Sequence, residues 1–367
     1  MSDDRAGELG HTQGVTPRVV LLSAFLRPFR SGAEACSEEV SARLQGEFDI
    51  VIVTARLRRD LPTADTLDGV PVVRVGFGFA GDKWLFPFLA PFAARRLKPA
   101  LIHAVLESYA GLGLIICSWL LPKVPRLLTC QSTNTSLLVG SMHRAATMIT
   151  VISSVLKVRA AAFGRPDAVL IPNGITLTAI AAATCPKVPG RILFAGRLEP
   201  MKGVDVLLKA FTAIRRDFPA WHLHIVGDGG ERVFLETLSH QLSLDGAVTF
   251  TGKMTHEAVL AEFAEAEIFA GLSRSEALGN VFLEAQASGC AVLATNVGGI
   301  PDIVADGKAG LLIPSDDVAA ATEGLRRLVN DPAWRTAMAE AGRHNAQAYD
   351  WDSVAARYGE QYKALLR

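Results

Sequence analysis

The chain has 367 residues, which is too many for one ordinary hydrophobic core and suits two domains of roughly 150–200 residues. Half of the residues are hydrophobic and a fifth are charged, a globular composition that excludes an intrinsically disordered chain. Lysine plus arginine equals aspartate plus glutamate at 37 each, so the basic excess of a typical nucleic-acid-binding protein is absent and we expect no nucleic-acid partner.

The cysteines and the beginning of the chain indicate a reducing compartment. The five cysteines are scattered and have no C-x-x-C spacing, which argues against a disulfide framework or a zinc site. Residues 1–17 are polar, lack the apolar stretch of a signal peptide and are expected to form a flexible tail. The longest apolar run, Tyr109–Pro122, is too short to cross a bilayer and indicates a buried helix packed on a sheet. We therefore expect a cytoplasmic protein.

Short β-branched runs alternate with longer helical stretches along the chain. In the first half, strands are expected at Arg18–Ala24, Asp49–Ala55, Pro71–Val75, Ala100–Val105, Arg126–Cys130, Thr147–Ile152 and Ala168–Pro172. In the second half, they are expected at Arg191–Ala195, His222–Val226, Val248–Gly252, Ile268–Leu272, Ala291–Thr295 and Gly310–Ile313. Continuous apolar strands separated by helices indicate parallel sheets covered on both faces, and the right-handed crossover rule gives doubly wound α/β folds.

The break between the halves falls in residues 175–190, a small, polar, proline-containing stretch that precedes a new strand. We expect one Rossmann-like domain over residues 18–180, a second over residues 181–345, and a helix over residues 346–367 that packs back on the first domain. Ligands of such sheets bind beyond the carboxyl ends of the strands. A cleft between the domains should therefore be built from the loops that follow the strands.

The segment Ser273–Cys290, SRSEALGNVFLEAQASGC, carries the strongest chemical signal. Glu276 follows a buried strand, Gly279 allows backbone to approach a ligand, and Asn280 is suited to cap a helix whose free N–H groups form an anion site. Glu284 lies just over one turn into that helix. Diphosphate-binding amides would thus be flanked by two hydroxyl-accepting carboxylates, and the plain alternative is a capped helix with two solvated acids.

A second segment, Gly196–Gly203 or GRLEPMKG, follows the first strand of the second half. Its Arg197 and Lys202 could grip phosphate oxygens, because arginine offers a bidentate fork and lysine a compact charge. The alternative is two ordinary surface cations. The position of the loop, at the carboxyl end of a strand in the same domain as the first segment, favours the phosphate role.

Together these segments resemble the retaining glycosyltransferase family 4, whose GT-B architecture has two Rossmann-like domains facing a central cleft. The resemblance covers most of the chain and is densest over Arg191–Pro314. It is carried by E-x7-E at Glu276 and Glu284, G-R-L-x-x-x-K-G at Gly196–Gly203, V-G-D-G at Val226–Gly229, G-G-I-P-D at Gly298–Asp302, I-P-N-G at Ile171–Gly174 and a terminal aromatic helix at Tyr349–Tyr362.

The resemblance implies a role for each of these residues. Arg197 and Lys202 would neutralise the donor diphosphate, Glu276 would hold hydroxyls of the transferred sugar, and Glu284 would accept hydrogen bonds from the ribose. The remaining donor contacts are expected from Gly196, from the amides of Leu278, Gly279, Asn280 and Val281, and from the base-side loop at Lys253 and Met254. Family members work without a metal, and the chain has no convincing D-x-D motif, so we expect neither a metal nor another cofactor.

The implied activity is that of a hexosyltransferase-type enzyme. It would move a sugar from a UDP- or GDP-sugar to a glycan or lipid-linked acceptor, with the departing phosphate deprotonating the acceptor on the same face. A covalent intermediate on a carboxylate is the mechanistic alternative. A sugar-nucleotide epimerase and a non-catalytic sugar-nucleotide binder remain as alternative functions. A nicotinamide-dependent dehydrogenase is excluded because no G-x-G-x-x-G follows the first strand.

The first half departs from the family pattern in its own loops. The glycine-rich loop after the first strand keeps only Gly32, which could still offer its amide to the donor. His103 ends a strand and could line the cleft as a catalytic residue, or be a satisfied core histidine. Where relatives often have a second histidine, this chain has Gln131, which cannot act as an acid or base. Gln131, Ser132 and Asn134 are therefore candidates for the acceptor side.

One local cluster mixes basic and aromatic residues. Residues Lys83–Lys98 read KWLFPFLAPFAARRLK, a composition that suits a helix touching an anionic membrane surface. Peripheral association with the inner surface of a membrane is therefore a hypothesis, and a solvated end on an ordinary helix is its alternative.

Overall fold

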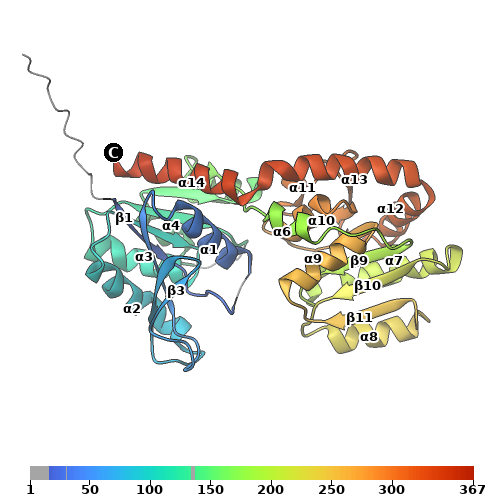
Figure 1. Ribbon diagram of the computed structural model, residues 1–367, viewed down its shortest axis with the longest axis horizontal. Helices are drawn as coiled ribbons and strands as arrows, with labels where there is room; N and C mark the ends of the chain where they lie inside the picture. Colours follow the sequence, from blue (N-terminus) through green and yellow to red (C-terminus); the bar gives the residue numbers. More distant parts are fainter. Residues whose placement is uncertain (1–15, 30, 134–136) are drawn as a thin grey trace, which may run out of the picture.

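The computed structural model describes residues 16–29, 31–133 and 137–367, and two sheets divide this part of the chain into two lobes (Figure 1). The N-terminal lobe holds an 8-stranded sheet with the order β3-β4-β2-β1-β5-β6-β7-β8. Its strands are β1 Arg18–Leu22, β2 Asp49–Ala55, β3 Ala64–Leu67, β4 Val70–Val75, β5 Leu101–Val105, β6 Arg126–Cys130, β7 Met148–Val151 and β8 Val169–Leu170. Its helices are α1 Gly32–Leu44, α2 Asp82–Arg96, α3 Tyr109–Leu120, α4 Val139–Ala145 and α5 Ser154–Ala162, and α6 Leu177–Ala182 lies in the connection to the second lobe.

The N-terminal sheet is covered on both faces, as continuous apolar strands require. Val20 and Leu22 of β1 belong to a buried cluster with α2 and α3, whereas Val19 and Leu21 belong to one with α1. The edge strand β3 corrects the expectation of a wholly parallel sheet, because it pairs antiparallel with β4. Its four residues are largely exposed and half of them are polar, so the segment lacks the apolar run that identified the other strands.

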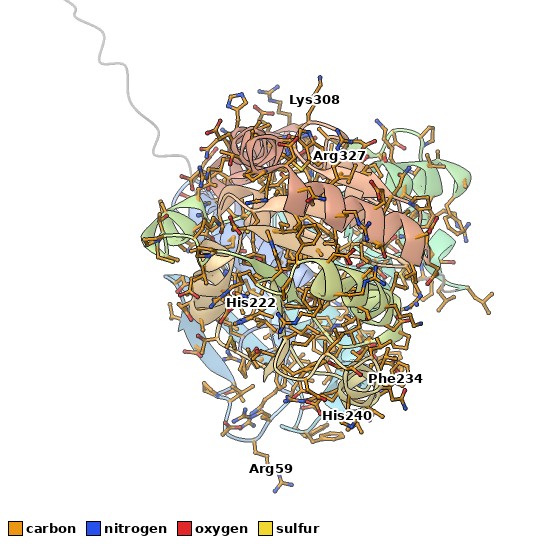
Figure 2. The ribbon with its side chains drawn as sticks, turned by 90° about the vertical axis from the view of Figure 1, so that its right-hand side faces the viewer. Arg59, His222, Phe234, His240, Lys308 and Arg327 are labelled. Atoms are coloured by element: carbon orange, nitrogen blue, oxygen red, sulfur yellow. The ribbon has the colours of Figure 1, made fainter. Side chains whose placement is uncertain are left out.

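The C-terminal lobe holds a 6-stranded parallel sheet with the order β11-β10-β9-β12-β13-β14. Its strands are β9 Arg191–Ala195, β10 His222–Val226, β11 Val248–Gly252, β12 Ile268–Gly271, β13 Ala291–Thr295 and β14 Leu311–Ile313. Its helices are α7 Val204–Asp217, α8 Arg232–Gln241, α9 His256–Glu265, α10 Asn280–Ala287, α11 Ile300–Ile303, α12 Val318–Asn330 and α13 Pro332–Ala346. Figure 2 views the molecule from the side of this lobe.

The chain crosses between the lobes twice at one place. The Ile175 amide donates to the Tyr349 carbonyl at 2.8 Å, and the Trp351 amide donates to the Ile175 carbonyl at 3.2 Å. Beyond the second crossing, α14 (Trp351–Leu366) runs back along the N-terminal lobe and packs against α1 (Figure 1). The last helix therefore completes one face of the first sheet.

A second contact joins the lobes at the start of α5. The Asp302 carboxylate accepts from the Ser154 amide at 2.6 Å and from the Ser154 hydroxyl at 2.7 Å. A carboxylate at a helix N-terminus is favoured by the unpaired amides and by the helix dipole. The G-G-I-P-D loop of the second lobe thus caps a helix of the first.

His103 lies inside the contact between β5 and α14 and not in a cleft, which corrects the cleft-lining role considered for it. Its Nδ1 is 2.7 Å from the Tyr362 hydroxyl and its Nε2 is 2.7 Å from the Thr129 hydroxyl. The side chain is fully buried, and burial lowers the pKa of His103 from 6.5 to about 3. The imidazole is therefore a neutral structural group that ties α14 to the sheet.

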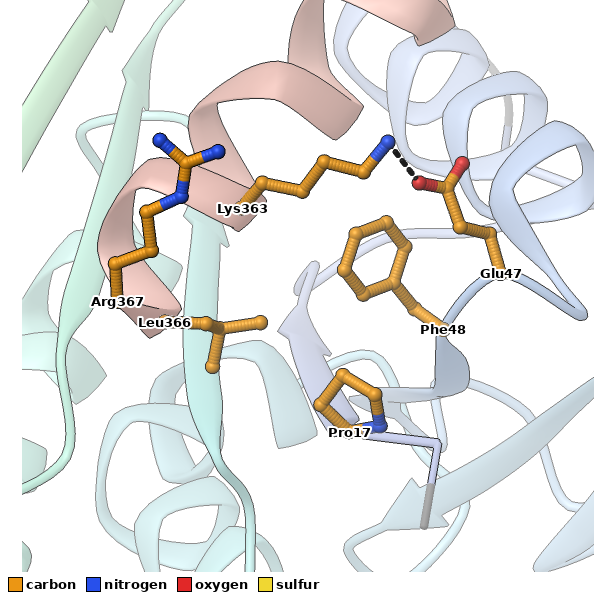
Figure 3. A pocket seen from close by; sticks show the side chains of 6 residues that line it. All are labelled: Pro17, Glu47, Phe48, Lys363, Leu366 and Arg367. Carbon is orange, nitrogen blue, oxygen red and sulfur yellow. Dashed lines mark ion pairs between the residues drawn. The ribbon is translucent and has the colours of Figure 1, made fainter. Parts of the chain in front are cut away.

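A shallow pocket of about 330 Å³ marks the far end of this contact (Figure 3). Its lining comes from the residues just before β1 and β2 and from the last turn of α14, where Lys363 pairs with Glu47 at 2.5 Å. The pocket lies at the amino ends of the strands. It is therefore on the opposite edge of the sheet from the loops that are expected to bind ligands.

The buried neutral His103 predicts a pH dependence of stability. The unfolded chain takes up the proton near pH 6.5 and the folded chain only near pH 3, so this stabilisation is present above pH 6.5 and is lost as the pH falls. Between pH 7 and pH 5 the group should cost about 2 kcal/mol of the free energy of unfolding. Urea unfolding at both pH values should show a smaller decrease in His103→Gln than in the wild type; equal decreases would refute the assignment.

Candidate functional site

Three loops of the C-terminal sheet meet at the carboxyl ends of β9, β12 and β13, and glycines make the meeting possible. Gly203 has φ +64, and a Cβ built on it would lie 2.0 Å from the Leu272 carbonyl oxygen. Gly298 has φ +57, and its Cβ would lie 1.8 Å from the Glu276 carbonyl oxygen. No other residue type fits where backbone touches backbone in a left-handed conformation. The loop after β12 is therefore held between the loops on its two sides.

This packing brings Lys202 and Glu276 together. Lys202 ends a short 3-10 turn, Pro200–Lys202, and its Nζ donates to Glu276 Oε2. Both side chains are only 17% exposed. The Arg274 amide donates to the Met201 carbonyl at 2.7 Å and fixes the two loops to each other. An ammonium and a carboxylate that lie far apart in the sequence thus share one partly buried position.

Arg197 lies in the same loop but faces solvent. Its side chain is 71% exposed, and its guanidinium is 3.3 Å from Glu199. The preceding residue, Gly196, donates its amide to the Val226 carbonyl at 3.0 Å and approaches Gly227, whose Cβ would lie 1.8 Å from the Gly196 oxygen. The G-R-L loop is therefore anchored against the V-G-D-G turn, while the Arg197 side chain is unrestrained by the core.

The beginning of α10 corrects the expected cap. The cap residue is Gly279, with φ +95, and Asn280 is the first helical residue. The chain enters the helix from a left-handed conformation, and a Cβ at Gly279 would lie 2.6 Å from the Phe282 ring and 3.1 Å from Glu276 Cγ. Glycine is thus required at this position. Leu278 is buried, whereas Asn280 and Val281 are half-buried in the first turn, where helical amides have no intrahelical acceptor.

Glu284 lies on α10 beside the loop that follows β11. Its Oε1 is 3.7 Å from Nε2 of His256, the first residue of α9. In that loop Lys253 is exposed and Met254 is half-buried against the core. His256 was not among the residues predicted from the sequence, although its place three residues after Lys253 puts it at the same strand end.

The N-terminal lobe contributes the start of α1. Ser31 caps this helix, and its amide donates to Glu34 at 2.8 Å. A Cβ at Gly32 would lie 3.4 Å from Asn173 Nδ2 and 3.6 Å from Asn280 Nδ2. The starts of α1 and α10 therefore face each other across the lobes, and the positive ends of both helix dipoles point to one region.

Buried amide side chains line the N-terminal side of this region. Gln131 Oε1 accepts from Asn173 Nδ2 at 2.8 Å, and Asn173 Oδ1 is buried without a hydrogen-bond partner among the described residues. An unpaired buried carbonyl oxygen is costly, and a ligand hydroxyl would satisfy it. Asn173, which was not singled out within the I-P-N-G segment, thus joins the candidates. Ser132 is half-buried next to Gln131, and Asn134 lies outside the described residues.

One group in the described part of the chain has the spacing of metal ligands. Donor atoms of Glu107, Cys130 and His143 lie within 4.8 Å of one another, all buried. Arg159 already bonds the Glu107 carboxylate, and burial raises the pKa of the Cys130 thiol well above its usual value. A neutralised carboxylate and a protonated thiol are poor metal ligands. The three side chains therefore fit a buried polar network, in which His143 contacts both Glu107 and Cys130.

Models of two protein families match the chain. The model described as glycosyl transferases group 1 matches residues 181–345, and the model described as glycosyltransferase family 4 matches residues 30–179. Together they cover every site loop described above and all strands of both sheets except β1.

Individual proteins show the same likeness. A D-inositol 3-phosphate glycosyltransferase of Corynebacterium urealyticum is 36% identical over 179 residues, which are 47% of this chain and 42% of that protein. A GDP-mannose-dependent alpha-(1-6)-phosphatidylinositol monomannoside mannosyltransferase of Mycolicibacterium smegmatis is 37% identical over 177 residues, 46% of each chain. The matched segment thus spans less than half the length of these curated relatives.

Solved structures share the fold over the whole molecule. Sucrose-phosphate synthase of Thermosynechococcus elongatus superposes with a TM-score of 0.78 at 22% identity, covering 95% of this chain and 99% of that one. Anabaena HepE in complex with UDP-glucose superposes with a TM-score of 0.78 at 18% identity, covering 95% and 100%. The two-lobed arrangement is therefore the GT-B fold.

The contact between Gly298 and the Glu276 carbonyl can be tested by one methyl group. Gly307 has a similar φ of +71 but nothing within 4 Å of its Cβ position, so Gly307→Ala is a matched control. We expect Gly307→Ala to cost about 1 kcal/mol of the free energy of unfolding, for the left-handed backbone alone. Gly298→Ala should cost a further 1–3 kcal/mol or so, because the carbonyl must move. Equal losses in chemical denaturation would show that the two loops do not touch.

Proposed function

The chain belongs to glycosyltransferase family 4, and we propose that it transfers a sugar from a nucleoside-diphosphate sugar to a glycan or lipid-linked acceptor with retention of the anomeric configuration. The observation that carries the proposal is the pairing of Lys202 with Glu276 beside the start of α10. A cation, a hydroxyl-accepting carboxylate and unpaired helix amides are the groups that a sugar diphosphate needs.

The diphosphate would bind at the ammonium of Lys202 and the first turn of α10. An ammonium has three donors, so Lys202 can keep its bond to Glu276 while it donates to a phosphate oxygen. The exposed Arg197 has no core contact to break before it turns toward the same phosphate. The start of α1 at Gly32 adds a second positive helix end from the other lobe.

The transfer step would be driven by stabilisation of the negative charge that develops on the leaving diphosphate. The bond between the anomeric carbon and the phosphate oxygen breaks, and the leaving diphosphate gains the charge that Lys202, Arg197 and the helix amides stabilise. The acceptor oxygen bonds to the same face of that carbon and gives its proton to the departing phosphate oxygen. Glu276 holds sugar hydroxyls and forms no bond to carbon, so a sugar adduct on Glu276 in mass spectrometry would overturn this scheme.

The proposed donor is a UDP- or GDP-hexose, and the proposed reaction is independent of metal ions. One relative is named for GDP-mannose, and a structural neighbour was solved with UDP-glucose, so UDP- and GDP-hexoses are the first donors to consider. The cations and helix ends supply the charge stabilisation that a metal provides elsewhere, so the reaction is proposed to need none.

Lys202 provides the sharpest test of the phosphate role. Lys202→Ala should lower kcat about a hundredfold to a thousandfold, because removing one donor to a developing charge typically costs about 2.7–4 kcal/mol of barrier. Lys209→Ala removes an exposed lysine of α7 that pairs with Asp205 and should leave kcat unchanged. Steady-state kinetics with matched melting curves separate chemistry from folding. A folded Lys202→Ala enzyme with wild-type turnover would contradict the role.

Donor binding can be tested without knowing the acceptor. In a thermal-shift panel of UDP-, GDP- and ADP-sugars, one base should raise the melting temperature by mass action. Glu284→Ala should reduce that shift, because its proposed partner is the ribose, whereas Glu236→Ala on the surface of α8 should not. The absence of any shift would count against a sugar-nucleotide site. Donor consumption that needs no acceptor would indicate an epimerase instead.

A further inference from the structure

One surface of the N-terminal lobe exposes large aromatic side chains. Trp84, Phe88 and Phe92 of α2 are 64%, 61% and 55% exposed, and Trp119 of α3 is 79% exposed. Helices α2 and α3 lie side by side on the side of the lobe that is remote from the C-terminal lobe (Figure 1). The aromatic face is defined here as these four residues with Phe77 and Phe79, which are exposed in the loop before α2. Large exposed apolar side chains gathered on adjacent elements in this way mark an interaction surface.

On α2, the exposed aromatic side chains form a stripe along one side of the helix. Trp84, Phe88 and Phe92 are spaced by four residues, just over one helical turn, so their side chains lie on one side of the helix. Phe86, Ala90 and Ala94 are fully buried on the other side, against the sheet. The stripe ends in the exposed Arg95, which lies close to the direction of Trp84 around the helix. The outer aromatic residues therefore take no part in packing the core.

Charge distinguishes this part of the chain from the rest. Residues 69–166 contain eleven lysines and arginines and two acids, a net charge of +9 in a chain whose net charge is zero. The two acids, Asp82 and Glu107, are both buried. Asp82 faces inward, where it accepts from the Gly78 amide at 2.7 Å. The exposed basic residues on α2 and just after it, Arg95, Arg96 and Lys98, thus border the aromatic face without an acidic neighbour on that helix.

We propose that the aromatic face of α2 and α3 binds the surface of an anionic membrane. Exposed indole and phenyl rings enter the interface between headgroups and acyl chains, and the basic residues bind anionic headgroups. An acidic protein would satisfy the charges but not a row of six exposed apolar side chains, and a second copy would place like charges against each other. Within the described residues no helix is long and apolar enough to span a bilayer, so the contact is made at the surface.

The surface is continuous with the carboxyl edge of the sheet. The Trp84 ring stacks edge-on to Tyr109, with ring centroids 5.1 Å apart, and Tyr109 contacts Phe25 with centroids 6.1 Å apart. Phe25 follows β1 and Tyr109 starts α3 after β5, so this row of rings leads from the aromatic face to the strand ends. Resting on the proposed transferase function, the acceptor is lipid-borne and reaches the region between the starts of α1 and α10 from this side.

Vesicle sedimentation tests the surface independently of turnover. Wild-type protein should sediment with phosphatidylcholine vesicles that contain phosphatidylglycerol, weakly with phosphatidylcholine alone, and less at high salt. Arg95→Gln with Arg96→Gln should bind about thirtyfold more weakly, since each basic residue near an anionic surface contributes about fivefold. Lys209→Gln with Arg216→Gln removes two exposed charges from α7 and should bind as the wild type does.

The contribution of the aromatic side chains is tested with two double variants, one on the aromatic face and one control on α8. Trp84→Ser with Phe88→Ser should abolish sedimentation, whereas Val233→Ser with Phe234→Ser should not. This control removes two exposed residues of α8, of which Figure 2 labels Phe234. Equal sedimentation of all variants, no sedimentation of the wild type, or a wild-type dimer in light scattering that Trp84→Ser with Phe88→Ser dissolves would each overturn the proposal. The donor-induced thermal shift of the double-serine variant, expected to be intact, separates failure of the surface from failure of the transferase function.

Discussion

Contact of backbone with backbone at three glycines holds the site together. The carbonyl oxygens of Leu272, Glu276 and Gly196 lie where the Cβ atoms of Gly203, Gly298 and Gly227 would be. Each contact joins loops from different strands of one sheet, so the loops after β9, β10, β12 and β13 have a single arrangement relative to one another. Lys202 and Glu276 meet because their backbones are fixed in this way, and the long lysine side chain needs only to span the remaining gap. Side-chain chemistry at the site therefore depends on residues that have no side chain.

The two lobes contribute different kinds of charge to the region between them. The C-terminal lobe brings the cations Lys202 and Arg197 and the start of α10, whereas the N-terminal lobe brings the start of α1 and the neutral amides of Gln131 and Asn173. A pyrophosphate requires positive potential, and sugar or acceptor hydroxyls require neutral donors and acceptors. The Asp302 contact with α5 joins the lobes to each other, which the proposed binding of one ligand by both sets requires. The cationic side chains therefore come from the C-terminal lobe, and the neutral amide side chains come from the N-terminal lobe.

Much of the fold could be predicted from the sequence, because buried parallel strands are continuous apolar runs. Every strand expected from such a run is present, and the one that was missed, β3, is exposed and half-polar. Within the site, the loop residues could be predicted from their position after strands. Contacts between residues that are far apart in the sequence could not be predicted in this way. The burial of His103 depends on Tyr362, which lies 259 residues away, and the role of Asn173, which follows β8, depends on Gln131, which follows β6. The cap at Gly279 was missed because Asn280 is the better capping residue by type, whereas the backbone conformation selected glycine.

The return of α14 has a consequence for how the protein is made. Tyr358 and Tyr362 fill the core between α1 and the first sheet, so that core stays open while the ribosome synthesises the entire second lobe. Domains usually fold in order as they emerge, yet here the first lobe waits for a helix encoded after the second. Until α14 is made, the first lobe exposes an apolar face that can aggregate. Binding by chaperones would cover this face, and rapid folding of the second lobe would shorten the time before α14 packs on it.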